Sequence, residues 1–331
     1  MGNSQTYTQE DFDRYSYQVY QATLQRTCFL PDVGIDESLL KYSGINSNAV
    51  LQSYSNELVS MVPDYIEKFG SSLGAVTSFP NAVGLGALVI SMIMELIMKS
   101  RTETTEDSYS MFRRVFGEEK ASSVRDTMSE YVRRHRMFMI NDQLLQEELM
   151  RLERQLSKDL TILRNSLLHD QQMSTRGFKI WVNGASFHVQ MLIHRARLNT
   201  RTGRQISDNV HTIETAISLY LMDLDRLLEK YKTYMSNSIT ITFEKAYCVF
   251  FGGCIDAVCT IENDDRNCKG FTDTPYTHDP CGEPDFKMAY INQIVSNYEP
   301  ISGLKSHFSN IKNNLNSLIN QRGSFTLPSR G

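Results

Sequence analysis

The cysteines are the residues whose type and spacing point most directly to chemistry. Cys28 stands alone near the N-terminus, and the others crowd into residues 248–281: Cys248, Cys254, Cys259, Cys268 and Cys281. Such clusters form disulfides or bind a metal, and zinc is disfavoured because no pair has Cys-x-x-Cys spacing. We expect a disulfide between Cys268 and Cys281 across the turn-rich "KGFTDTPYTHDP" if the compartment is oxidising, with free buried thiols as the alternative.

No other set of side chains carries a catalytic signature. The 7 histidines and Cys28 are not ordered with Ser or Asp into a nucleophile motif. The segment "VGLGAL" follows no predicted strand, which argues against a nucleotide-binding loop, and "ENDDRN" lacks the spaced ligands of an EF-hand. We therefore expect a protein that is not an enzyme, with no catalytic residues, metal or cofactor.

The charges favour lipid over nucleic acid as a partner. The 331-residue chain has 34 Lys+Arg against 38 Asp+Glu, a net charge of −4, so no nucleic-acid partner is expected. Two local basic runs stand out, "RRHR" at 133–136 and a run beginning at His194. The second run is expected to bind anionic lipid headgroups, with a solvated loop as the alternative: Arg195, Arg197, Arg201 and Arg204.

The N-terminus is polar and lacks the apolar core of a cleavable secretory signal. We expect a protein that stays in the cell, leaves it by an unusual route, or had a leader removed, so the sequence does not fix the compartment. The start "MGNSQT" also matches the pattern for N-myristoylation at Gly2.

One segment, residues 71–94, is uncharged between Lys68 and Glu95. As a helix it would reach about 36 Å, enough to cross a hydrocarbon core of about 30 Å. Its continuous apolar run is only Ala82–Met94, however, and runs of that length are more typical of a buried core helix. Ser78, Ala82 and Gly86 fall four apart, the spacing that lets helices meet closely in membranes. The segment can therefore be permanent core, or core that is later released to lipid.

The rest of the chain is patterned for long helices. No proline occurs between Pro80 and Pro275. Apolar residues step by three, four or seven from Val124 through Leu167, and an unbroken helix over about 105–170 would be on the order of 100 Å long. Further helical patterns cover 178–195 and 206–234, with Gly203 between them, and shorter ones cover 8–29, 47–69 and 304–318. The long helices are expected to fold back antiparallel.

Residues 238–262 break this pattern. They alternate with a period of two, are rich in β-branched and aromatic residues, and carry Gly252-Gly253 at the centre. This predicts a β-hairpin whose tip, "AYCVFFGGCI", is uncharged.

The predicted fold class is mainly α: an elongated antiparallel helical bundle, plus a small β-hairpin and a loop-rich region near residues 238–285. We expect a bundle over 1–237 that contains the apolar segment 71–98, a hairpin and Cys-rich loop over 238–284, and C-terminal helices over 285–331 that pack back on the bundle.

In layout the chain resembles the α-helical pore-forming toxins of the cytolysin A type. The resemblance is carried by Ala82–Met94, the Leu145–Leu167 stripe and "AYCVFFGGCI" at 246–255, and covers most of the chain. In those toxins the membrane-entering tongue usually interrupts the helices, whereas here the hairpin follows them. The chain is also similar to fish rapunzel-type proteins, which place a Gly-containing apolar segment ahead of long charged helices.

The resemblance implies a helical protein that moves an apolar element into a lipid membrane and forms a homo-oligomer there. The expected helix contacts are Ser78, Ala82 and Gly86. The expected membrane-inserting residues are Ala82, Val83, Leu85, Leu88, Val89, Ile90, Met92, Ile93, Phe250 and Phe251. The alternative is an intracellular helical scaffold or interaction protein in which the apolar helix is always buried.

Overall fold

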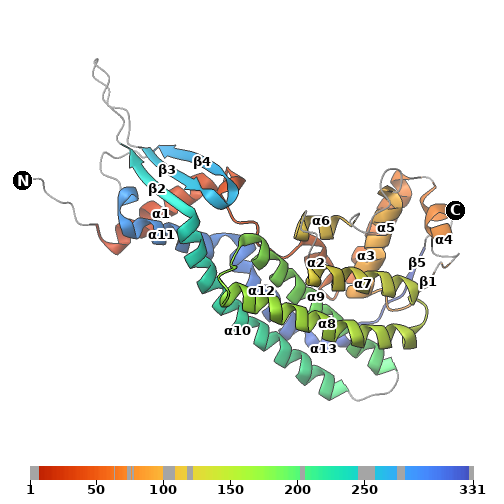
Figure 1. The fold of residues 1–331 in the computed structure, drawn as a ribbon. Helices are drawn as coiled ribbons and strands as arrows, with labels where there is room; N and C mark the ends of the chain where they lie inside the picture. Colours follow the sequence, from red (N-terminus) through yellow and green to blue (C-terminus); the bar gives the residue numbers. More distant parts are fainter. Residues whose placement is uncertain are drawn as a thin grey trace, which may run out of the picture.

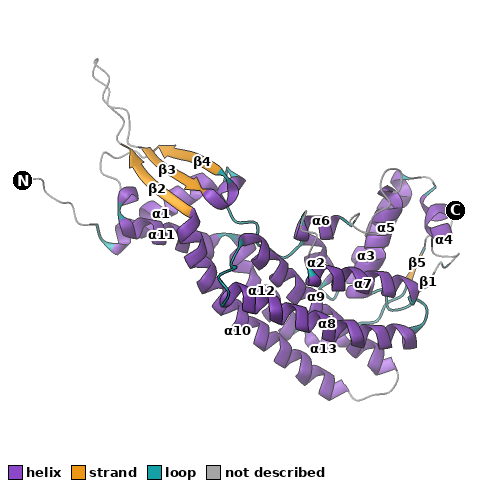
Figure 2. Ribbon diagram, in the orientation of Figure 1, coloured by secondary structure: helices purple, strands orange, loops and turns teal. Residues whose placement is uncertain are grey.

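The computed structural model describes residues 7–62, 64–72, 76, 78–99, 109–117, 122–201, 206–244, 258–273 and 280–327. It confirms the predicted fold class, since it is mainly helical with two small antiparallel sheets (Figures 1 and 2). Several residues singled out in the sequence lie outside these ranges, and the predictions for them stay predictions: Gly2, Gly203, Arg204, Cys248, Phe250, Phe251, Gly252, Gly253 and Cys254.

Three long consecutive helices form the body of the molecule: α8 (Asp142–Leu168), α9 (Thr175–Arg201) and α10 (Ile206–Ser238). The leucine stripe predicted on α8 is buried, and this face packs against α9: Leu145, Leu149, Leu152, Leu156, Leu160 and Leu167. Helix α9 lies in the middle, because every side chain from position 178 to 194 is buried. The polar side chains on α9 must therefore find hydrogen-bond partners on the elements that pack against this helix.

The single helix considered for 105–170 does not exist in the described part of that range. The chain forms α6 (Ser110–Phe116), α7 (Ser123–Met137) and α8 instead. Gly117 ends α6 with φ = 58°, and the Asn141 side chain accepts a hydrogen bond from the Leu144 backbone N–H at 3.1 Å to begin α8. Apolar spacing continues through these breaks, so periodicity alone does not detect them.

The remaining helices pack along this body and at its two ends. Helix α11 packs on α1 and α10, α12 packs on α10, and α13 packs on α9. At the other end, α5 is surrounded by α2, α3, α4, α7 and α9. The bounds are α1 (Gln9–Thr23), α2 (Glu37–Tyr42), α3 (Ser47–Met61), α4 (Tyr65–Ser72), α5 (Leu85–Lys99), α11 (Pro284–Asn297), α12 (Glu299–Asn313) and α13 (Leu315–Asn320).

The predicted hairpin is part of a three-stranded sheet. Strand β2 (Ile239–Glu244) pairs antiparallel with β3 (Val258–Asn263), as predicted, and β3 pairs in turn with β4 (Cys268–Asp273), a strand that was not predicted. This sheet lies at the opposite end of the molecule from α5 (Figure 1). A two-stranded sheet, β1 (Ser78–Phe79) with β5 (Phe325–Thr326), joins the segment before α5 to the C-terminal segment.

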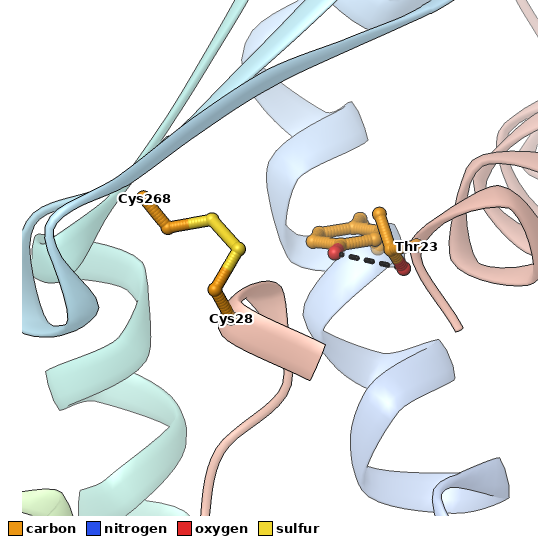
Figure 3. The surroundings of a disulfide bond; sticks show 4 residues. Thr23, Cys28 and Cys268 are labelled. Atoms are coloured by element: carbon orange, nitrogen blue, oxygen red, sulfur yellow. Dashed lines mark hydrogen bonds between the residues drawn. A yellow bond between two sulfur atoms is a disulfide. The ribbon is translucent and has the colours of Figure 1, made fainter. Parts of the chain in front are cut away.

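The predicted Cys268–Cys281 disulfide is wrong. Cys28 in the short helix η1 (Thr27–Phe29) pairs with Cys268 at the start of β4, and Cys259 in β3 pairs with Cys281 in η4 (Pro280–Gly282). The Cα atoms are 5.8 Å apart in Cys28–Cys268, which is the disulfide in Figure 3, and 6.1 Å apart in Cys259–Cys281. Strand pairing brings β4 beside η1, so the nearest cysteine in sequence is not the nearest in space. Beside the first disulfide, the Tyr290 hydroxyl donates to Thr23 Oγ1 at 3.3 Å.

The two disulfides should differ in their effect on stability, because they close loops of 240 and 22 residues. Loop-closure entropy predicts that Cys28→Ser/Cys268→Ser lowers the free energy of unfolding by about 2 kcal/mol more than Cys259→Ser/Cys281→Ser does. Denaturant unfolding of the two double variants beside the parent measures this difference. Equal losses would show that chain entropy does not control the contribution of these bonds.

Candidate functional site

The apolar segment is the interior of its end of the molecule. The predicted membrane-inserting side chains in the described part of the chain are all buried, with exposed fractions of 0–2%: Ala82, Val83, Leu85, Leu88, Val89, Ile90, Met92 and Ile93. They lie in α5 and the turn before it. Among the helices described here, none is both long and apolar enough to cross a bilayer.

The small-residue stripe predicted on this segment is wrong. Ser78 lies in β1, Ala82 lies in the turn that follows, and only Gly86 is in α5. Asn81 and Gly84 have φ values of 59° and 54°, so the chain reverses before the helix begins. A Cβ at Gly86 would stand 2.3 Å from the Asn81 carbonyl oxygen, so glycine is needed there for a tight turn within the chain itself.

A buried polar cluster lies beneath the start of α5. Its members come from one face of α9, at positions i, i+4 and i+7, and from one face of α7, at i and i+4. They are Gln190, His194 and Arg197 on α9, and Tyr131 and His135 on α7, with exposed fractions of 0–4%. The His135 ring centroid is 5.5 Å from that of His194 and 5.7 Å from that of Tyr131. The cluster contacts α5 through His194, because a Cβ at Gly86 in α5 would lie 3.5 Å from His194 Cε1.

Most of this cluster lacks hydrogen-bond partners within the described residues. Neither ring nitrogen of His194 has one, nor do the Gln190 amide, the Tyr131 hydroxyl and His135 Nδ1. Leaving a buried polar group unpaired costs about 1–3 kcal/mol. The layer under α5 is therefore an unfavourable packing surface for an apolar helix.

Arg197 is the member of the cluster whose side chain does have hydrogen-bond partners. Its position shows that the prediction of a lipid-headgroup contact for Arg197 is wrong in this fold. It is 1% exposed, and its guanidinium donates to the carbonyl oxygens of Leu318 at 2.7 Å and Val83 at 3.3 Å and to Gln321 Oε1 at 3.0 Å. It therefore ties the turn before α5 to the C-terminal segment and is not available to lipid. Gly84 makes room for it, since a Cβ there would stand 2.3 Å from Arg197 Nη1.

The other predicted headgroup residues are not gathered with Arg197. Arg195 points to another partner, because its Nη1 lies 2.6 Å from Glu153 Oε2. The Arg201 side chain and all of Arg204 lie outside what the structure describes. The predicted basic surface is therefore not assembled by the described residues.

The electrostatics leave the cluster with a single cation at neutral pH. Burial lowers the pKa of His135 to about 4, and burial followed by the nearby His135 and Arg197 holds the pKa of His194 well below its usual value. Burial also lowers the pKa of Arg197 to about 9, and it raises the pKa of Tyr131. Both imidazoles are thus neutral beside a buried guanidinium.

Elsewhere on α9 a histidine is fully paired, which sets the cluster apart. His188 Nε2 lies 3.0 Å from Glu153 Oε1, and the Tyr220 hydroxyl lies 3.0 Å from His188 Nδ1. Arg195 pairs with the other oxygen of the same carboxylate, Glu153 Oε2. Burial alone therefore does not leave histidines unpaired in this protein. Among the described residues, buried polar side-chain atoms without partners are concentrated in the cluster beneath α5, although a few lie elsewhere, such as Asn263 Oδ1 in β3.

In the sequence, His194 and "RRHR" stand out only as parts of basic runs. The helical spacing of Gln190, His194 and Arg197 was available in the sequence, but nothing there showed that α7 would bring His135 onto the same layer. Comparisons with family models, curated proteins and solved structures found no match to this chain.

Removal of the Arg197 contacts should loosen this end of the protein. Arg197→Met keeps much of the side-chain volume but removes the hydrogen bonds to two carbonyl oxygens and to the Gln321 side chain, so the free energy of unfolding should fall by about 2–5 kcal/mol. Denaturant unfolding measures the loss. The matched control is Arg151→Met, which removes an exposed pair with Glu148 and should change stability little. Equal effects of the two substitutions would contradict the role given to Arg197.

Proposed function

We propose that this protein is membrane-active and that its soluble fold stores α5 for transfer to lipid. The observation that carries the proposal is a helix that, apart from Ser91, has no polar side chain over Leu85–Met94 and that packs over buried polar groups without partners among the described residues. Such a helix would be at least as stable in the hydrocarbon of a bilayer as it is in the interior of this protein.

The free energies of the two environments support this exchange. In water, exposing α5 would cost about 25 cal/mol for each Å² of apolar surface, which keeps it buried. In lipid that cost is largely removed, and the polar cluster left behind regains hydrogen bonds to water, a gain of about 1–3 kcal/mol for each group. Contact with a membrane therefore favours release, whereas water alone does not.

The length of α5 limits how it would enter the bilayer. Its 15 residues reach about 22 Å, less than the hydrocarbon thickness of about 30 Å. We propose that α5 enters the interface or one leaflet, and that deeper insertion draws on the turn before it. The layout of cytolysin A type toxins supports self-association into a homo-oligomer on the membrane, as an argument by analogy.

The rival function is a scaffold in which α5 never leaves. It is favoured by the ties around the turn before the helix: Ala82 N–H donates to the Gly323 carbonyl at 3.1 Å, and Gly84 N–H donates to Ser47 Oγ at 2.7 Å. With Arg197 and the β1–β5 pairing, these bonds fix the segment in place. The two functions differ in what the protein does to a vesicle.

We expect the purified chain to release an entrapped dye from phosphatidylcholine vesicles and from vesicles that also contain phosphatidylserine. Flotation of the protein with the vesicles and protection of residues 85–99 from protease would locate the inserted segment. If no dye is released across lipid compositions and pH values, membrane activity is wrong and the scaffold is the better description.

Gly86→Ala should separate the two functions further. The added Cβ would collide with the Asn81 carbonyl oxygen, so docking of α5 should weaken by about 1–3 kcal/mol. A membrane-active protein should then release dye several-fold faster, while a scaffold should only melt at a lower temperature. Gly44→Ala is the matched control, because a Cβ at Gly44 meets nothing within 4 Å and should change neither measurement.

A further inference from the structure

We propose that His135 and His194 form an acid-sensitive latch that releases α5 when the two imidazoles are protonated. The latch lies within this protein's own packing, and its consequence at membranes rests on the proposed function. In the closed form both rings are neutral and buried, with His194 packed against α5 and His135 packed against His194. Protonation adds charge beneath an apolar helix, and the helix is displaced so that water can reach the rings.

The geometry places that charge where it acts on the helix directly. His194 is 0% exposed, and its Cε1 lies against Gly86 in the first turn of α5. His135 approaches from α7 with its ring centroid 5.5 Å from that of His194. Because His194 has no hydrogen-bond acceptor among the described residues, an imidazolium there would have two donors and no partner. Solvent would supply acceptors, and the first turn of α5 packs against the His194 ring.

The surrounding groups do not compensate a new positive charge. Arg197, on the same face of α9, is already a cation, and Arg322 from the C-terminal segment adds a second positive charge near it. Tyr131 on α7 is neutral. Helix α8 brings Glu153, which His188 and Arg195 engage, and the first acidic residue of α5 is Glu95, which accepts a hydrogen bond from the Ser110 backbone N–H. Protonation would therefore add repulsion to the loss of hydration.

The direction of the pH dependence follows from the cause of each shift. Burial lowers the pKa of His135 to about 4 in the closed form, while an open form returns it to about 6.5. Opening therefore takes up protons, so the closed form is favoured at neutral pH and loses that advantage as the pH falls through 6.5 toward 4. For His135 alone, the opening equilibrium should rise about 20-fold between pH 7 and pH 5. His194 shifts in the same direction and adds to the change.

Hydrogen exchange of the full chain tests the latch without lipid. After correction for the intrinsic pH dependence of amide exchange, opening of residues 85–99 should increase at least 20-fold between pH 7 and pH 5, as for His135 alone. The variant His135→Gln/His194→Gln should reduce the increase to less than about 3-fold, because glutamine does not titrate. An increase that persists in this variant would overturn the latch.

Two controls keep the test decisive. His307→Gln removes another buried histidine, one that lies 2.8 Å from Ser186 Oγ and whose pKa burial also lowers to about 4, and it should leave the acid response of α5 intact. If the double histidine variant does not fold, the parent protein still decides the matter. Amides of α10 should stay protected at pH 5 while those of α5 open, and simultaneous opening of both helices would overturn the latch.

Dye release at pH 7 and pH 5 separates the latch from membrane activity. The assay uses phosphatidylcholine vesicles, whose net charge does not change over this range, and a dye insensitive to pH. Faster release at pH 5, lost in His135→Gln/His194→Gln, is expected. Acid-dependent exchange of α5 without any dye release would leave the latch standing and overturn the proposed function. Dye release and α5 exchange that are both equal at the two pH values would leave the function standing and overturn the latch.

Discussion

Helix α9 buries every side chain from position 178 to 194, and the rest of the fold is arranged around the polar residues within that stretch. Lys179 reaches Asp32 at 2.6 Å, and the Asn183 side chain bonds the backbone of Gly34 and Asp36 at 3.0 Å and 2.7 Å. These contacts explain why the segment before α2 lies on α9. A central helix that carries polar side chains requires each neighbouring element to supply a partner.

That requirement is met unevenly along the helix. His188 is bonded through both ring nitrogens, whereas Gln190 and His194, on the side that meets α5 and α7, have no partner among the described residues. Locally unfavourable packing of this kind is tolerated when the surrounding structure is stable, and it often marks a part of the protein that moves. In this protein the unpaired polar groups lie beneath α5, the most apolar of the described helices. The polar groups would be more stable in contact with water, whereas α5 is stable only in apolar surroundings.

The covalent and noncovalent restraints divide between the two ends of the molecule. The disulfides Cys28–Cys268 (Figure 3) and Cys259–Cys281 join η1 and η4 to the three-stranded sheet, which lies at one end of the molecule (Figure 1). At the other end, the segment around α5 is held by packing, by the β1–β5 pairing and by the hydrogen bonds of Arg197. These restraints around α5 are noncovalent. The rearrangement of α5 that we propose would therefore not require either of these two disulfides to break.

The sequence by itself determined the helical class, the buried leucine face of α8, the pairing of β2 with β3 and the apolar character of residues 82–94. Each of these follows from a local period or a local composition, which a single segment contains in full. Only the tertiary structure decided that Cys268 joins Cys28, that Arg197 is buried, that Ser78 is not on the same helix as Gly86, and that His135 meets His194. These outcomes depend on which distant segments lie side by side, and on caps and turns that interrupt an otherwise continuous apolar pattern, and neither is encoded in the spacing of one segment.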